Sequence, residues 1–224
     1  MDFKLNEMSL LTERPPLEKA AALLKEGRVI AFKSVGGYNL LANPFEEVAV
    51  QDLREVKKRE AKPFAIMFRD VEEIKKYCRV SRIEERLLTS SARPILLLER
   101  KTIEELEAMR PGNYEELRKS RHIGAFLPSM GAQHILLELF DGPLIVTSAN
   151  LSDMPMIRSE EEMFLMMDQN PKIAETFFNS RKIVSGVDDS VVRVIDGQPQ
   201  MIRRSKGYVP VPLYMEGGRE EVFA

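Results

Sequence analysis

The sequence predicts an α/β protein in which helices and short strands alternate. Apolar residues recur at helical spacing in several stretches, for example at Leu17, Ala20 and Leu24. Short continuous apolar runs such as 29–32 separate these stretches and are typical of buried strands. The chain has 224 residues, of which 44% are hydrophobic and 30% charged, as in an ordinary soluble globular protein. We expect one large domain.

The first half of the chain can be divided at its prolines and glycines. Pro15 and Pro16 begin a helix that Gly27 ends, and the next strand leads into a turn at 33–40 that contains Gly36 and Gly37. These paired glycines fit either a tight turn or a close backbone approach by a ligand. The remaining elements expected here are a helix at 45–58, a strand at 64–68, helices at 70–78 and 81–90, and a strand at 94–99.

The second half continues the alternation and ends in a hairpin. The charged stretch 101–121 is expected to be an exposed pair of helices without a chemical role. Ser159 and Glu162 form the capping box of a helix at 160–168. The other elements expected are a strand at 123–127, a helix at 132–140, a strand at 143–146, and a hairpin of 191–195 and 200–204 around the turn 196–199.

Composition excludes several classes of function. With 33 basic and 35 acidic residues, the net charge is -2, so no global field favours nucleic acid and an anion site must be a local cluster. The single Cys78 rules out a disulfide framework, and only His122 and His134 are present, so we expect no metal centre built by the protein. No apolar run is long enough to span a membrane and no secretory signal begins the chain, so we expect a cytoplasmic protein.

Three cations meet at the corner between the expected helix at 45–58 and the strand at 64–68. Lys57, Arg59 and Lys62 lie around this corner, and Pro63 ends any preceding helix. Cations in the last turn of a helix also complement its dipole by about 0.3–1 kcal/mol each. From these residues alone, the corner is either a solvated basic turn or the binding site of a polyanion.

Two further polar groups lie at the ends of expected strands. Residues 147–152 carry three hydroxyls and an amide, including Ser148 and Asn150, which either cap a helix or donate hydrogen bonds to phosphate and sugar oxygens. Arg203 and Arg204 follow the hairpin and, with Lys206, form a second basic group.

These segments together resemble a known family. GGYNL, KKREAKPFAIMF, TSANLS and DDSVVRV with IDGQPQMIRR stand in the order seen in the YrdC-like domain of the hydrogenase-maturation carbamoyltransferase HypF. The resemblance covers roughly residues 16–212. The related threonylcarbamoyl-adenylate synthases of tRNA modification share the K-x-R and S-x-N elements, whereas the glycine turn and the DDSVVRV segment favour the HypF branch.

The resemblance implies a fold, a reaction and a set of site residues. It implies a twisted mixed sheet with surrounding helices and a wide, concave, basic cavity, in a domain at 15–210 between a lead-in at 1–14 and a connector at 211–224. The reaction would be adenylation of carbamate by ATP with Mg²⁺, supplied with carbamate or carbamoyl phosphate, and the partners would be other domains of the full protein and its acceptor protein. Lys57 and Arg59 would be catalytic, and the nucleotide would be bound by Lys57, Arg59, Lys62, Ser148, Asn150, Ser190, Arg203 and Arg204.

The chain departs from the family pattern where the acyl substrate would bind. Asn39, Gln133 and Asn179 stand in place of histidines. Amides can replace imidazoles as hydrogen-bond partners but cannot carry their charge. Two alternatives stay open: a threonylcarbamoyl-adenylate synthase, and an RNA-binding module that uses a basic cavity, against which the balanced net charge argues.

Overall fold

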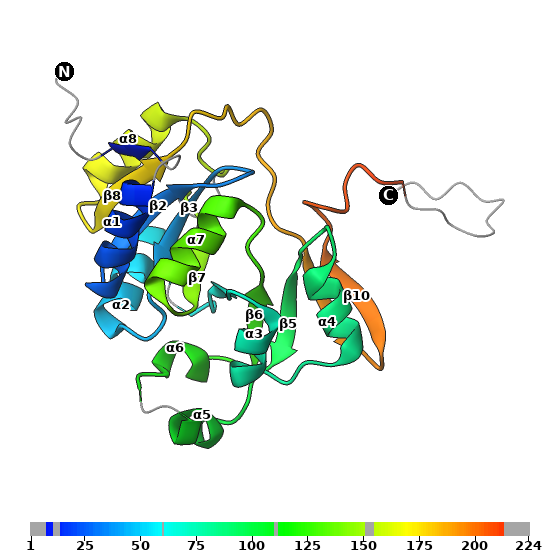
Figure 1. Cartoon of the computed structure of the whole chain (residues 1–224). Coiled ribbons are helices and arrows are strands. Elements are labelled where there is room, and N and C mark those ends of the chain that lie inside the picture. The colour runs from blue at the N-terminus through cyan, green and yellow to red at the C-terminus, as the bar shows by residue number, and fades with distance from the viewer. Residues whose placement is uncertain (1–7, 11–13, 60, 110–111, 151–154, 213–224) are drawn as a thin grey trace.

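A computed structural model describes residues 8–10, 14–59, 61–109, 112–150 and 155–212, and these form a mixed ten-stranded sheet with helices around it (Figure 1). The strand order is β1-β8-β2-β3-β7-β4-β6-β5-β9-β10. The predicted α/β class is therefore confirmed. No described helix is both long and apolar enough to cross a bilayer.

The elements alternate along the chain as expected. The strands are β1 Met8–Leu10, β2 Val29–Lys33, β3 Tyr38–Ala42, β4 Ala65–Met67, β5 Ile95–Glu99, β6 His122–Phe126, β7 Leu144–Ser148, β8 Ile173–Phe178, β9 Val191–Ile195 and β10 Gln198–Arg203. The helices are α1 Arg14–Lys25, α2 Glu47–Lys57, α3 Val71–Tyr77, α4 Arg82–Thr89, α5 Ile103–Met109, α6 Glu115–Arg118, α7 Gly131–Phe140 and α8 Glu160–Gln169.

The sheet mixes parallel and antiparallel neighbours. β8 is parallel to both β1 and β2, while β3 is antiparallel to both β2 and β7. Further along, β4 pairs parallel to β6, and β9 pairs parallel to β5 and antiparallel to β10. The register that matters most for the site places Asn39 of β3 opposite Ser148 of β7.

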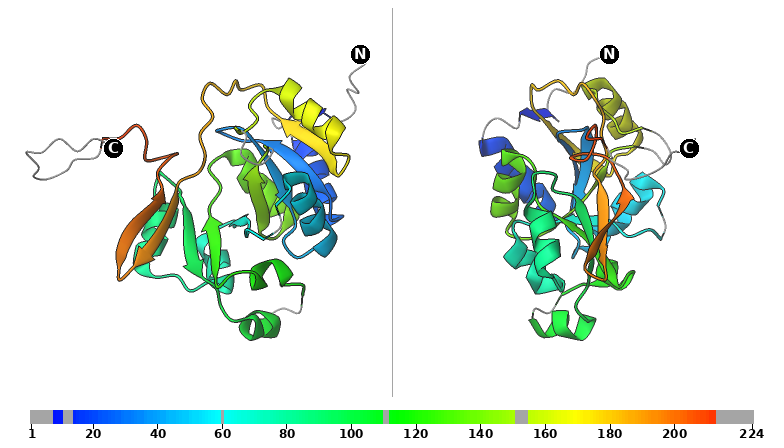
Figure 2. Two further views of the ribbon diagram at one scale, coloured as in Figure 1. Left: turned by 180° about the vertical axis from the view of Figure 1, so that it is seen from behind. Right: turned by 90° about the vertical axis from the view of Figure 1, so that its right-hand side faces the viewer.

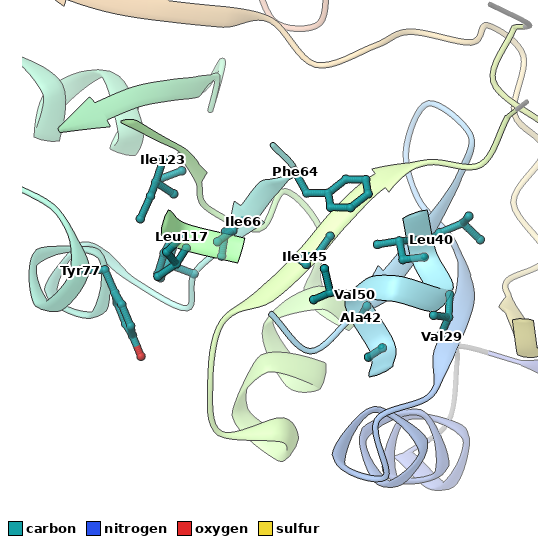
Figure 3. Packing of buried hydrophobic residues seen from close by; sticks show 14 of the residues in the cluster. Val29, Leu40, Ala42, Val50, Phe64, Ile66, Tyr77, Leu117, Ile123 and Ile145 are labelled. Atoms are coloured by element: carbon teal, nitrogen blue, oxygen red, sulfur yellow. The ribbon is translucent and has the colours of Figure 1, made fainter. Parts of the chain in front are cut away.

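Two hydrophobic clusters bury the two faces of the sheet. Successive side chains of a strand point to opposite faces, and in β2 Val29 and Ala31 belong to one cluster whereas Ile30 and Phe32 belong to the other. Helices α1 and α7 lie side by side and cover the second face (Figure 1). Val50 of α2 packs with Leu40, Ala42 and other residues of the first cluster (Figure 3).

Three strands were not predicted. The sequence predicts a turn at 33–40, but Tyr38–Ala42 forms β3, which is buried between β2 and β7, so pairing on both sides overrides the local glycine signal. The sequence predicts no strand at Ile173–Phe178, which forms β8. Met8–Leu10, within the expected lead-in, forms the edge strand β1 beside β8.

A long connection crosses one end of the sheet. β8 lies second from one edge and β9 second from the other, so the chain between Phe178 and Val191 must traverse the sheet (Figure 2). This crossing brings Asp189 to the cavity that Ser34 and Asn39 line, and it brings Asp188 within electrostatic reach of Lys57 in α2.

Candidate functional site

The side chain of Lys57 joins the end of α2 to the segment after β7. Its ammonium donates hydrogen bonds to the carbonyl oxygens of Ser148, at 2.7 Å, and Asn150, at 2.8 Å, and also to Asn150 Oδ1. Ser148 Oγ donates to the same Oδ1 at 2.7 Å. The structure thus brings together three of the residues predicted for the site, and Lys57 fixes the backbone that presents the other two.

Burial controls the charge of Lys57. The side chain packs under the corner and the residue is only 6% exposed. Burial and the nearby positive charge of Arg59 lower the pKa of Lys57 to about 8, while Asp188 acts in the opposite direction. An ammonium whose proton equilibrium lies near neutral pH responds strongly to a nearby anion, because an opposite charge favours the protonated form.

Arg59 lies beside this cluster and contacts the next turn of the chain. Its Nε donates to Lys62 O at 3.1 Å and its Nη2 donates to Pro63 O at 2.6 Å. The guanidinium also lies 4.8 Å from the centroid of the Phe64 ring, within the range of a cation–π contact. Burial and Arg54 lower the pKa of Arg59. Lys62 is exposed at the surface of the same turn.

A buried ion pair that the sequence did not reveal supports the turn. Arg54 Nη2 donates to both carboxylate oxygens of Glu116, at 3.0 and 2.7 Å, and Arg54 Nη1 donates to Arg59 O at 3.0 Å. The backbone N–H of Phe64 donates to Glu116 Oε1 at 3.1 Å. The expectation that 101–121 is exposed and without a role is wrong at Glu116, which is 4% exposed. No local sequence pattern identifies Glu116 as buried, because its partners are Arg54 in α2 and Phe64 just before β4.

The second basic group divides into separate contacts. Ser190 is buried, and its Oγ donates to Lys206 O at 3.0 Å and accepts from Ser205 N at 2.7 Å. Arg203 Nε donates to Asp189 O at 2.9 Å, and its Nη1 lies 3.6 Å from Asp188 Oδ2. Arg204 Nη2 instead donates to the carbonyl oxygens of Tyr208, at 2.7 Å, and Val211. The Asp188 carboxylate therefore lies close to the Arg203 guanidinium, and its negative charge also acts on the pKa of Lys57.

The paired glycines accommodate the protein's own chain. A Cβ atom on Gly36 would lie 2.4 Å from the carbonyl oxygen of Val187, and one on Gly37 would lie 2.2 Å from Met156 Sδ. Neither glycine has a positive φ. The tight-turn interpretation is confirmed, because Ser34 N donates to Gly37 O at 2.8 Å and residues 34–37 join the antiparallel strands β2 and β3. The atoms that approach the glycines closely belong to the crossing connection and to the segment before α8, not to a ligand.

A small polar cavity lies next to this turn. Its polar lining consists of Ser34, Asn39, Ser129, Gln133, Asp189 and Lys206. Two of the three amides expected around the acyl substrate therefore lie together. Asn179 is placed elsewhere: its carbonyl oxygen accepts from the ammonium of Lys33 at 3.2 Å.

A larger cavity, of about 360 Å³, is lined by Phe45, Tyr77, Tyr114 and neighbouring residues, and it contains none of the predicted site residues. Among the described residues, no group of three or more histidine, cysteine, aspartate and glutamate side chains could hold a metal ion.

Comparison with known proteins assigns the family. The Sua5/YciO/YrdC family model, described as "telomere recombination", matches residues 22–205. The chain belongs to the Sua5/YciO/YrdC family. Within it, the chain is 32% identical to the carbamoyltransferase HypF of Rhizobium leguminosarum bv. viciae over 216 residues, which is 93% of this chain and 27% of the relative. HypF of Rhodobacter capsulatus is 36% identical over 202 residues, 90% of this chain and 25% of the relative.

Solved structures of this family agree in fold. A full-length HypF in a phosphate- and nucleotide-bound form matches with a TM-score of 0.79 and 39% identity, over 89% of this chain and 30% of that one. The Sua5 protein of P. abyssi, complexed with L-threonine, matches with a TM-score of 0.70 at 22% identity, over 88% of this chain and 57% of that one. The chain spans about a quarter of the length of the HypF relatives it matches.

Proposed function

We propose that this chain binds ATP beside Lys57 and forms carbamoyl-adenylate from carbamate. One observation carries the proposal: the Lys57 ammonium holds Ser148 and Asn150 in one cluster, with Arg59 and Asp188 beside it. The cluster presents cations, hydroxyls and an amide, which are the groups that bind phosphate and sugar oxygens. The related full-length HypF structure, 30% of which this chain covers, is in a phosphate- and nucleotide-bound form, and this supports a nucleotide as the ligand.

The proposed reaction is an adenylyl transfer. A carbamate oxygen attacks the α-phosphorus of ATP, a new P–O bond forms, and the bond from the α-phosphorus to the bridging oxygen of the β-phosphate breaks. The products are carbamoyl-adenylate and pyrophosphate. Such a transfer depends mainly on positioning and on stabilisation of phosphoryl charge, so a site without a general base is sufficient.

The contacts of each site residue indicate the role that it would have in this reaction. Lys57 positions Ser148 and Asn150 and places a positive charge beside them, so its effect on the nucleotide is partly indirect. Arg59 can offer two donors to a phosphate when it exchanges the carbonyl oxygens of Lys62 and Pro63 for phosphate oxygens. The exposed Lys62 provides a further cation. Arg203, whose guanidinium lies beside Asp188, would supply a further cation to the nucleotide, and Ser190 holds the adjacent backbone through Ser205 N and Lys206 O.

The residues present fit a magnesium ion carried mainly by the nucleotide. Mg²⁺ is usually bound by one or two carboxylates together with substrate phosphates and water. Asp188 is the carboxylate whose field reaches Lys57, and it would hold the ion with the phosphates. The ion would neutralise charge that develops on the phosphoryl oxygens.

The proposal is tested by the release of pyrophosphate from ATP. Carbamate generated from bicarbonate with ammonium should support release by the full chain, and carbamoyl phosphate should do so after hydrolysis to carbamate and phosphate. Lys57→Ala and Arg59→Ala should each weaken ATP binding by about tenfold or more, as expected for loss of a charge-assisted contact. Unchanged ATP titrations with both variants would refute the assignment.

A second candidate is threonylcarbamoyl-adenylate synthesis. The mouse threonylcarbamoyl-AMP synthase is 30% identical over 147 residues, 65% of this chain and 50% of that protein. Threonine with bicarbonate would then drive pyrophosphate release better than ammonium with bicarbonate. Equal release with and without threonine would remove this candidate.

We also propose that the product is used by another part of a longer protein. The HypF relatives are about four times as long as the matched region. Carbamoyl-adenylate hydrolyses readily in water, so a second domain would receive it directly and transfer the carbamoyl group to an acceptor protein in hydrogenase maturation. Addition of the remaining domains of a HypF relative should increase the carbamoyl transfer measured with this chain; no increase would contradict the proposal.

A further inference from the structure

The small polar cavity beside the glycine turn provides a balanced set of donors and acceptors. It has room for about 20 Å³, enough for one small polar group. Its neutral lining comes from Ser34, Asn39, Ser129 and Gln133, and its two charges come from Asp189 and Lys206. This composition suits a small neutral ligand that both donates and accepts hydrogen bonds.

The existing hydrogen bonds show which groups remain for a ligand. Gln133 Oε1 accepts from Ser129 N at 3.0 Å, so the Gln133 amide presents its NH₂ group as a donor. Ser34 Oγ lies 2.5 Å from Asn39 Oδ1 and 3.0 Å from Gly37 O, and when its single hydrogen is donated to Asn39 Oδ1 the Asn39 NH₂ group is a donor as well. Lys206 Nζ donates to Asp189 Oδ1 at 2.9 Å and to Ser129 Oγ at 3.2 Å. An ammonium has three hydrogens and a carboxylate has two oxygens, so Lys206 retains a donor and Asp189 an acceptor.

We propose that this cavity recognises the unsubstituted carbamoyl group, with Asp189 accepting from its NH₂ and Lys206 donating to its carbonyl oxygen. The inference rests on the proposed function and adds the residues that select the acyl substrate. Asn39 and Gln133 supply further donors to the carbonyl oxygen. The ion pair holds both charged groups at fixed positions, so the cavity binds the carbamoyl group in one orientation, with the NH₂ toward Asp189 and the carbonyl oxygen toward Lys206. The two charges of the cavity cancel.

The same geometry discriminates against a substituted carbamate. A threonyl substituent would replace one N–H and bring a carboxylate, a hydroxyl and a methyl group into a cavity with room for one small group. A carboxylate would also face Asp189. We therefore expect the site to reject N-substituted carbamates through both size and charge, and specificity of this kind usually depends on such unfavourable contacts.

The test compares carbamate with N-methylcarbamate in the pyrophosphate-release assay with the full chain. Carbamate is generated from ammonium and bicarbonate, and N-methylcarbamate from methylammonium and bicarbonate. The wild-type chain should prefer carbamate by at least about tenfold in kcat/KM, the loss expected when a buried polar group is left unpaired.

Asp189→Asn should raise the KM for carbamate at least tenfold and change the KM for ATP less than twofold. Lys172→Met, which removes the ion pairs of Lys172 with Asp52 and Glu55, is the matched control and should change neither KM.

A charge-swapped variant separates recognition from a purely structural role. Asp189→Lys combined with Lys206→Asp restores an ion pair between the two positions but reverses its polarity. Recovery of the wild-type KM for carbamate in this variant would show that the pair only holds the chain together and would overturn the inference. A thermal unfolding midpoint near that of the wild type, together with a KM that stays high, would support it.

A binding measurement keeps this inference distinct from the proposed function. Titration of carbamoyl phosphate into the chain with a non-hydrolysable ATP analogue should give at least tenfold weaker binding for Asp189→Asn than for the wild type. If ATP binds and pyrophosphate is released but Asp189→Asn matches the wild type, only the cavity assignment is wrong. If the chain neither binds ATP nor releases pyrophosphate, the proposed function is wrong, and the titration alone decides whether the cavity binds a carbamoyl group.

Discussion

Arg54 donates two hydrogen bonds to the carboxylate of Glu116, at 3.0 and 2.7 Å, although 62 positions separate the two residues. Both side chains are buried, with exposed fractions of 11% and 2%. Through this pair α2, the short helix α6 and the start of β4 are joined beneath the turn that carries Arg59. The positions of the catalytic candidates therefore depend on residues that would not touch the substrate.

Removal of one partner from this pair should destabilise the protein strongly. Glu116→Ala leaves the buried guanidinium of Arg54 without its counter-ion, and we expect a loss of about 3–5 kcal/mol in the free energy of unfolding. Chemical denaturation provides the measurement. Arg79→Ala, which removes the exposed Arg79–Glu105 pair, is the matched control and should cost no more than about 1 kcal/mol. Similar small losses for both variants would show that the buried pair does not stabilise the turn.

The elements that the sequence predicted well are those with a complete local signal. Ser159 and Glu162 were expected to form a capping box, and both of its hydrogen bonds are present at the start of α8. The Gly27 helix stop has a φ of +74°, as its position requires. By contrast, β3 and β8 are determined by pairing on both sides, which their local sequences do not reveal.

The site was predictable only in part, for a similar reason. The basic corner and the Ser148–Asn150 segment could be recognised as separate motifs, and their order along the chain indicated the family. The contact of Lys57 with the Ser148 carbonyl oxygen spans 91 positions and comes from the tertiary fold. Arg54 and Glu116 carried no recognisable motif, because each gains its role from partners on other elements. Lys206 was expected only as a member of the second basic group, and its ion pair with Asp189 comes from the tertiary fold.

The close contact at Gly36 predicts sensitivity to the smallest substitution. A Cβ atom there would meet the Val187 carbonyl oxygen at 2.4 Å, a backbone atom that cannot rotate away. Gly36→Ala should therefore displace the crossing connection and cost about 1–3 kcal/mol in the free energy of unfolding. Gly131→Ala is the control, because no atom lies within 4 Å of its added Cβ and it stands in the first turn of α7. An equal effect of the two substitutions in thermal or chemical denaturation would contradict this reading.

The two adjacent arginines after β10 should differ in function. Arg203 lies 3.6 Å from Asp188, which acts on Lys57, whereas Arg204 is bound to the carbonyl oxygens of Tyr208 and Val211. Arg203→Ala should weaken ATP binding by about tenfold, and Arg204→Ala by less than about twofold. Isothermal titration of both variants under the same conditions provides the comparison. A larger loss with Arg204→Ala would mean that the nucleotide reaches the other side of the hairpin.

The lowered pKa of Lys57 predicts a pH limit for nucleotide binding. Burial and Arg59 lower this pKa to about 8, so in the unbound protein the ammonium loses its proton above that pH rather than near pH 10.5. Phosphate charge favours the protonated form, so ATP binding should take up a proton at and above about pH 8, and affinity should fall by up to about tenfold per pH unit beyond it. Titrations in buffers of different ionisation enthalpy measure this uptake. The Lys57→Met variant should bind ATP weakly and take up little proton on binding. A wild-type affinity for ATP that stays constant from pH 7 to pH 10 would show that the charge of Lys57 does not act on the nucleotide.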